Sequence, residues 1–175
     1  DIEEEIRAKK IKIKEIRFRE IGFALRDKRE FNENIRIKKI VYKASDGKEI
    51  FLQAVNKDNI LFGLLRLRLD KETEYGMIRE LHVYGPVVGL GEFDATSSPK
   101  DFALFNRKKI EEERAKSFQH RGLGKALMEK AEEIARKKKK KAMKVISGVG
   151  VRDYYKKLGY KLDSDGVYME KNLIW

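Results

Sequence analysis

The chain has 175 residues and a formal net charge of +12 at pH 7, from 41 Lys and Arg against 29 Asp and Glu. Its hydrophobic fraction of 41% can fill one sizeable core, so we expect a single domain. The absence of cysteine excludes disulfides and thiolate metal sites within the chain. No apolar run approaches the length of a membrane span, and residues 1–12 lack the apolar core of a signal peptide. We therefore expect a soluble, cytoplasmic protein without a membrane partner.

The N-terminal half is predicted to be mostly strands. Residues 1–33 are interpreted as a basic linker segment. Residues 34–44 alternate apolar and basic side chains, and the Asp46-Gly47 pair predicts a turn into a second strand at residues 49–57. Two more strands are expected at residues 60–70 and 77–84, which would complete an antiparallel meander.

The next segment, residues 85–117, is predicted to be a long loop with room for a short helix. It contains both prolines of the chain, Pro86 and Pro99, and a strongly charged run at residues 106–117.

Residues 119–126, QHRGLGKA, run directly into an amphipathic helix. Leu127, Ala131 and Ile134 recur there at helical spacing, so Gly122 and Gly124 lie at or just before the helix start. The free amides and the positive end of the helix dipole favour an anion at this position. Glycines also leave room for a pyrophosphate to approach the backbone. An ordinary glycine turn before a surface helix is an equal alternative for this loop taken alone.

Residues 144–160 add a second set of signals. They indicate a buried strand, a glycine turn and a short helix that carries Tyr154 and Tyr155 and ends at Gly159. This order of loop, helix, strand and tyrosine-bearing helix resembles the coenzyme A half of the GNAT acetyltransferase superfamily. Residues 78–85, 118–124, 145–160 and 168–173 are similar in particular to the C-terminal acetyltransferase domain of Elongator catalytic subunits, and residues 15–23 resemble the entry into it.

The resemblance implies an α/β GNAT fold over residues 34–175, with a mixed, mostly antiparallel sheet flanked by helices and split at a cofactor cleft. It also implies acetyl-CoA as the acyl donor. Its implied binding residues are main-chain groups of Glu80, Leu81, His82 and Val83, the loop residues Gln119, His120, Arg121, Gly122, Leu123, Gly124, Lys125 and Ala126, and the side chain of Tyr155.

Tyr155 is the predicted catalytic residue. It lies four residues before Gly159, as the phenol does in the superfamily, where it would protonate the departing thiolate of coenzyme A. Tyr154 is the less favoured neighbour, and packing of both rings against the sheet is the structural alternative. Glu80 or His82 could act as a base. No metal is expected in this chain.

Together with the transfer RNA that the resemblance implies as substrate, the lysine run that follows the main helix is predicted to contact nucleic acid, because clustered cations attract phosphates. Its members are Lys137, Lys138, Lys139, Lys140 and Lys141. The run taken alone is more typical of a solvated helix end.

The resemblance further implies a function in modification of the tRNA wobble uridine, with acetyl-CoA cleavage coupled to tRNA binding. It implies a radical-SAM-like partner domain, which would hold an iron–sulfur cluster and S-adenosylmethionine outside this chain. Because the sequence starts at Asp1, we expect a piece of a longer or processed protein. Two alternatives remain: a protein lysine or small-molecule N-acetyltransferase, and a non-catalytic module that binds acetyl-CoA and RNA.

Overall fold

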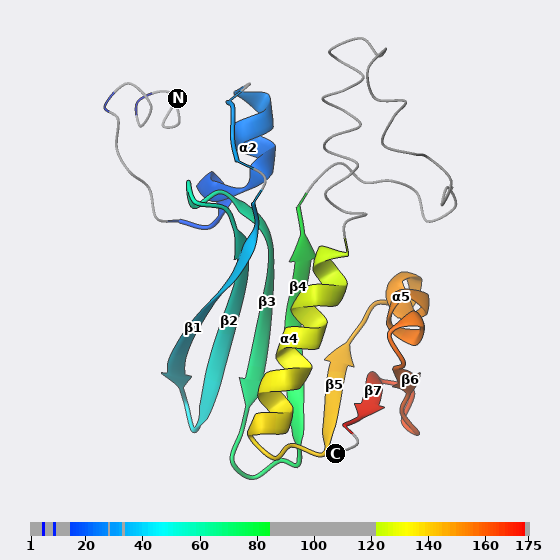
Figure 1. The fold of residues 1–175 in the computed structure, drawn as a ribbon. Helices are drawn as coiled ribbons and strands as arrows, with labels where there is room; N and C mark the ends of the chain where they lie inside the picture. The colour runs from blue at the N-terminus through cyan, green and yellow to red at the C-terminus, as the bar shows by residue number, and fades with distance from the viewer. Residues whose placement is uncertain are drawn as a thin grey trace.

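The computed structural model describes residues 15–27, 29–32, 34–84 and 122–173, together with Glu5 and Lys9. Within these residues the chain forms one seven-stranded sheet in the order β1-β2-β3-β4-β5-β7-β6 (Figure 1). The elements are η1 (Arg17–Arg19), α2 (Ile21–Arg26), β1 (Arg36–Ala44), β2 (Gly47–Val55), β3 (Leu61–Leu69), β4 (Tyr75–Val83), α4 (Leu123–Lys137), β5 (Ala142–Ile146), η3 (Val149–Val151), α5 (Arg152–Lys157), β6 (Lys161–Leu162) and β7 (Tyr168–Asn172).

The meander predicted for the N-terminal half is confirmed. β1 and β2 form an antiparallel hairpin that continues antiparallel into β3 and β4. Gly47, the first residue of β2, leaves room for the side chains of Arg68 and Asp70, which a Cβ at this position would displace. The predicted loop at residues 85–117 lies outside the described residues.

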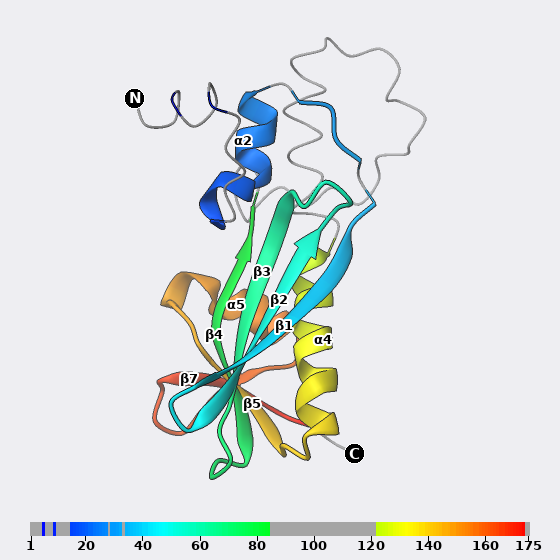
Figure 2. The ribbon, with the colours of Figure 1, turned by 90° about the vertical axis from the view of Figure 1, so that its left-hand side faces the viewer.

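Helix α4 covers one face of the sheet, because its apolar side chains recur on a single side. Leu127, Met128 and Ala131 are fully or almost fully buried, and they pack against strand residues that include Leu52 and Leu67. Figure 2 shows α4 standing along this side of the strands, with α2 across their upper end.

The segment interpreted as a linker contributes to the core. Ile21 and Ala24 of α2 are 0% and 2% exposed and pack with Ala54 and Phe62 of β2 and β3. A parallel bridge between Glu20 and Leu61 joins the start of this helix to the sheet. The division of the chain at residue 33 stays a prediction, but residues 16–26 pack as part of the folded body.

Candidate functional site

The sheet splits between β4 and β5, the only parallel pair among the described strands. The two strands pair only where residues 75–78 lie beside residues 142–145. The upper half of β4 continues along β3 without β5 on its other side (Figure 1). Four predicted cofactor-binding residues lie in this half: Glu80, Leu81, His82 and Val83. Main-chain groups on the open side are therefore available to a ligand that enters the split.

Helix α4 begins beside this split in a conformation that only glycine adopts without strain. Gly122 has φ +71°, and a Cβ at this position would meet nothing within 4 Å. Among the described residues no side chain caps the helix, so the amides of its first turn are open to a ligand or solvent. Leu123, Gly124, Lys125 and Ala126 form that first turn, whereas Gln119, His120 and Arg121 lie outside the described residues.

Tyr154 brings α5 to the start of α4. A Cβ built on Gly124 would lie 2.5 Å from the Tyr154 hydroxyl and 3.5 Å from Cγ2 of Val83. The Tyr154 oxygen is buried and makes no hydrogen bond within the described structure. Burial, with a smaller contribution from Tyr155, raises the pKa of Tyr154 to about 12, so the phenol holds its proton at neutral pH. The arrangement fits a coenzyme A: a glycine cradle, open strand groups and an unpartnered proton donor converge from three elements.

Tyr155 lies deeper than its neighbour. It is 7% exposed and belongs to the core cluster beneath α4. Its ring meets those of Tyr154 and Tyr160 edge to face, at centroid distances of 5.2 and 6.1 Å. Burial raises the pKa of the Tyr155 phenol as well. Its predicted catalytic role stays a prediction, while the described contacts bring Tyr154 to Gly124. The sequence identified both tyrosines, but it did not show how α5 is rotated, and this rotation decides which of the two side chains faces Gly124.

Glu80 and His82 point away from α4, together with a group that the sequence interpretation missed. Arg66 of β3 forms an ion pair with Glu80, with Nε and Oε2 2.7 Å apart. The other carboxylate oxygen of Glu80 lies 3.4 Å from Nε2 of His82. Cross-strand pairing of Arg66 with Glu80 in β3 and β4 produces this contact. The sequence interpretation named Glu80 and His82 as candidate bases, but the partner of Glu80 comes from another strand.

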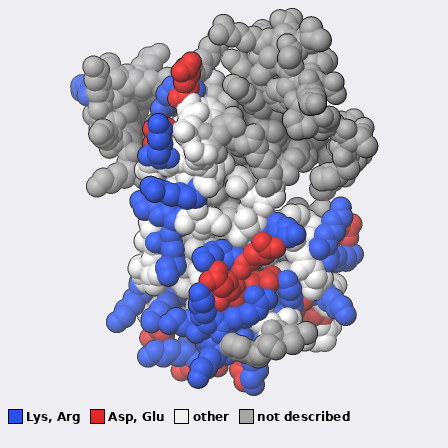
Figure 3. Space-filling view, viewed as in Figure 1, with Lys and Arg blue, Asp and Glu red and all other residues white. Residues whose placement is uncertain are grey.

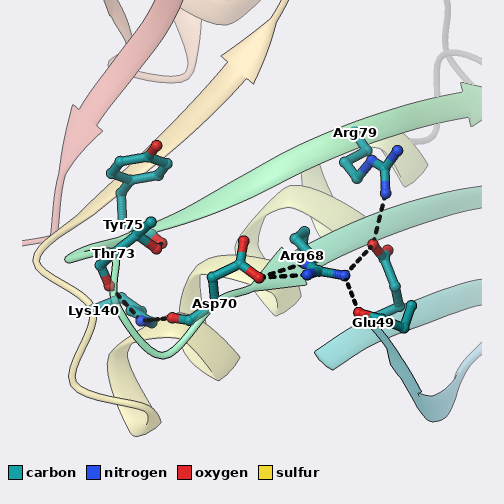
Figure 4. Close-up of polar contacts among 8 residues, drawn as sticks. Glu49, Arg68, Asp70, Thr73, Tyr75, Arg79 and Lys140 are labelled. Carbon is teal, nitrogen blue, oxygen red and sulfur yellow. Dashed lines mark hydrogen bonds and ion pairs between the residues drawn. The ribbon is translucent and has the colours of Figure 1, made fainter. Parts of the chain in front are cut away.

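The lysine run after α4 divides into side chains with different environments. Lys137 forms an ion pair with Glu133, and Lys141 with Glu74. Lys140 is only 8% exposed, and its ammonium donates hydrogen bonds to the carbonyl oxygens of Asp70 and Thr73 in the β3–β4 turn (Figure 4). Its side chain is therefore committed to the fold. Lys138 and Lys139 are exposed, and RNA contact by the run stays a prediction.

The face that carries α4 is densely charged. Figure 3 shows Lys and Arg spread over it, with a band of Asp and Glu among them. Within the described ranges, no group of three or more His, Cys, Asp or Glu side chains is placed to hold a metal ion. Over the same ranges, no helix has both the length and the apolar character to cross a membrane.

Comparisons with known proteins agree with this geometry. The model of the acetyltransferase (GNAT) domain family matches residues 115–174. Elongator complex protein 3 of Dictyostelium discoideum is 38% identical over 172 residues, which cover 93% of this chain and 27% of that protein. The tRNA uridine(34) acetyltransferase of Dehalococcoides mccartyi is 36% identical over 169 residues, which cover 90% of this chain and 32% of that protein.

A solved structure extends the agreement to three dimensions. The archaeal Elp3 of Methanocaldococcus infernus, with an N-terminal deletion, superposes with a TM-score of 0.71 at 34% identity, over 98% of this chain and 38% of that one. The chain thus spans about a third or less of the length of these curated relatives. The seven-stranded mixed sheet confirms the expected fold. With the split at β4, the glycine-led helix and these matches, the chain belongs to the GNAT acetyltransferases, in the group that includes Elongator complex protein 3.

Proposed function

We propose that this chain is an acetyl-CoA-dependent acetyltransferase domain that acts in modification of the tRNA wobble uridine, with acetyl-CoA cleavage coupled to tRNA binding. One observation supports the acetyl-CoA site above all others. The first turn of α4, the open half of β4 and the buried Tyr154 hydroxyl meet around Gly124. The tRNA and uridine part of the proposal rests on the names of the relatives.

Different residues of the site would bind the pyrophosphate, bind the pantetheine arm and donate the proton. Acetyl-CoA supplies an activated acetyl thioester when bound. The amides and dipole of the first turn of α4 would hold the pyrophosphate. The main chain of residues 80–83 would bind the pantetheine arm and polarise the acetyl carbonyl. A tyrosine on α5 would hold the proton for the leaving sulfur, because its raised pKa keeps the hydroxyl protonated.

We propose tRNA and a radical-SAM-like domain as partners, the latter carrying an iron–sulfur cluster and S-adenosylmethionine. Both partners are proposed from relatives that are longer than this chain, which spans 27% of one of them and 38% of another. A cytoplasmic location is part of the same proposal.

Replacing each tyrosine by phenylalanine tests the chemistry. Removal of the hydroxyl that donates the proton should slow coenzyme A release at least about tenfold with a nearly unchanged acetyl-CoA Kd. The contact of the Tyr154 hydroxyl with Gly124 favours Tyr154→Phe as the variant that loses turnover, whereas the spacing of Tyr155 from Gly159 favours Tyr155→Phe. Whichever variant keeps its turnover is the matched control for the other, and calorimetry measures the Kd of both. Equal, undiminished turnover in both variants would contradict a tyrosine proton donor.

A further inference from the structure

One edge of the described sheet is long and open to pairing. The strand order places β1 and β6 at the two edges. β6 has only two residues, and so short an edge offers little to a pairing strand. β1 has nine residues, pairs only with β2 among the described strands, and contains neither a bulge nor a proline (Figure 1). β1 therefore presents a regular strand edge that another strand could extend.

Half of the main-chain groups of β1 are turned away from β2. Residues 45–46 form the turn between the two strands, and Ala44 pairs with Gly47 on either side of it. In an antiparallel pair, every second residue directs its amide and carbonyl away from the partner strand. Counted from the pair that closes the turn, these residues are Ile37, Lys39, Val41 and Lys43. Their main-chain groups are the ones to which an added strand would bind.

The side chains of β1 combine exposed apolar surface with positive charge. Ile40 and Val41 are 42% and 50% exposed. Val41 alternates with Ile40 and shares the face of Ile37, which packs toward α4, so an added strand would lie beside apolar side chains on both faces. The strand has no acidic residue, and the described part of the chain records no ion pair for its four cations: Arg36, Lys38, Lys39 and Lys43.

We propose that β1 is a docking edge for an extended acidic segment of a partner protein, which adds to the sheet as a further strand. Strand addition takes its affinity from main-chain hydrogen bonds and its specificity from the side chains on either face. Carboxylates of the added strand would lie opposite the β1 cations, and its apolar residues would lie opposite Ile40 and Val41.

Two other occupants fit this edge less well. A second copy of the chain would bring four more cations against the same edge, and like charges across paired strands are destabilising. RNA phosphates can contact the cations, but they leave the outward amides and the exposed apolar side chains without a partner. The combination of a regular edge, exposed apolar residues and uncompensated positive charge therefore favours an acidic strand.

Variants at the centre of the edge test the assignment. Val41→Pro removes an outward amide at a position where an edge strand tolerates proline. Val41→Thr keeps the amide and the β-branched shape, and is the matched control. A third variant replaces all four β1 cations by glutamine. Circular dichroism verifies that each variant folds.

The probe is a nine-residue peptide. Its glutamates are placed to face the four cations in antiparallel register, with valine or threonine at the other positions. A nine-nucleotide single-stranded RNA is the comparison anion. Fluorescence anisotropy measures the Kd of both probes.

The parent should bind the peptide, and Val41→Pro should weaken this binding at least about tenfold, because a main-chain hydrogen bond is lost and the ring obstructs the added strand. Val41→Thr should stay within about twofold of the parent. The glutamine variant should weaken the binding of peptide and RNA alike, whereas RNA should bind Val41→Pro as it binds the parent. Hydrogen exchange followed by NMR should slow at the amides of Lys39 and Val41 when the parent binds the peptide.

A peptide affinity that is unchanged in folded Val41→Pro but lost in the glutamine variant would overturn strand addition and leave β1 as a contact for polyanions such as RNA. Failure of the parent to bind the peptide would overturn it as well. Should Val41→Pro not fold, unchanged exchange of the Lys39 and Val41 amides in the peptide-bound parent would have the same force. Self-association of the parent through these amides, detected by analytical ultracentrifugation and NMR, would assign the edge to a second copy instead.

Discussion

Gly124 is the residue at which the candidate site is most sensitive to a single added atom. A methyl group there would approach the Tyr154 hydroxyl to 2.5 Å, so the phenol or the helix start must shift. We expect Gly124→Ala to weaken acetyl-CoA binding at least about tenfold, and Gly124→Asp to abolish it, because aspartate adds negative charge at the predicted pyrophosphate position. Calorimetry measures both affinities.

Gly22→Ala provides the control for this prediction. A Cβ at Gly22 in α2 would meet nothing within 4 Å, so the change should leave acetyl-CoA affinity as it is. A folded Gly124→Asp protein with parental affinity would show that the loop does not hold the pyrophosphate.

The sequence predicted the positions of individual site residues where the spacing of residues along the chain is enough to place them. Gly122 and Gly124 were placed at the start of α4 because the apolar period of the helix begins beside them. The choice between Tyr154 and Tyr155 was less accessible, since it depends on how a six-residue helix is rotated by its packing against α4. Arg66 was missed because only strand register brings it to Glu80.

At the scale of elements, a buried polar cluster joins α4 to the C-terminal strands. Glu132 is 4% exposed and accepts hydrogen bonds from the Tyr160 hydroxyl, at 3.0 Å, and from the Lys171 ammonium, at 2.9 Å. Burial and the adjacent Glu132 raise the pKa of the Tyr160 phenol, which therefore remains a donor. The cluster joins α4 to β7. This contact holds the helix to the end of the sheet that is formed by the short strands β6 and β7.

Glu132→Gln should lower the free energy of unfolding by about 2 kcal/mol, because it leaves the Lys171 ammonium without its counter-charge. The loss is smaller than for a fully buried pair, since Lys171 is partly exposed to water. Urea denaturation measures it. Glu133→Gln, one residue away on the exposed side of α4, should leave the midpoint almost unchanged. Equal midpoints for both variants would contradict a stabilising cluster.

Lys140 ties the end of α4 to the β3–β4 turn, and this contact makes a separate prediction. Lys140→Met should destabilise the protein by about 1–3 kcal/mol, because two charge-assisted hydrogen bonds to turn carbonyls are lost. Lys138→Met, at an exposed position in the same run, is the control and should have little effect. Thermal unfolding followed by circular dichroism compares the two. Equal melting temperatures would show that the turn does not depend on this contact.

The sequence predicted β1 to β4 to within about two residues, because runs of apolar residues bounded by turn signals mark each strand, although β2 and β3 are buried on both faces. Helix α2 was not separated from the preceding basic segment, since its six residues are too few for a helical period to stand out. The short β6 lacks such a signal for the same reason.

At the scale of the whole molecule, the net charge of +12 is distributed between compensated and uncompensated surfaces. Around α4, glutamates pair with Lys130, Lys137 and Arg136, and Figure 3 shows the acidic band among the basic side chains. The edge strand β1 differs. It exposes four cations for which the described part of the chain records no ion pair: Arg36, Lys38, Lys39 and Lys43.

Since an acidic neighbour repels phosphate as well as neutralising a lysine, β1 should contribute more to RNA affinity than the run after α4. Replacing all four β1 cations by glutamine should reduce the slope of log K against log salt for tRNA by about 3, at roughly 0.7–0.9 per phosphate contact. Lys138→Gln with Lys139→Gln should reduce it by no more than about 1.8. Filter binding across a salt series measures both slopes, and acetyl-CoA affinity should not change in either variant. A larger loss of slope from the lysine pair than from the β1 variant would place the RNA at the end of α4, where the sequence first indicated it.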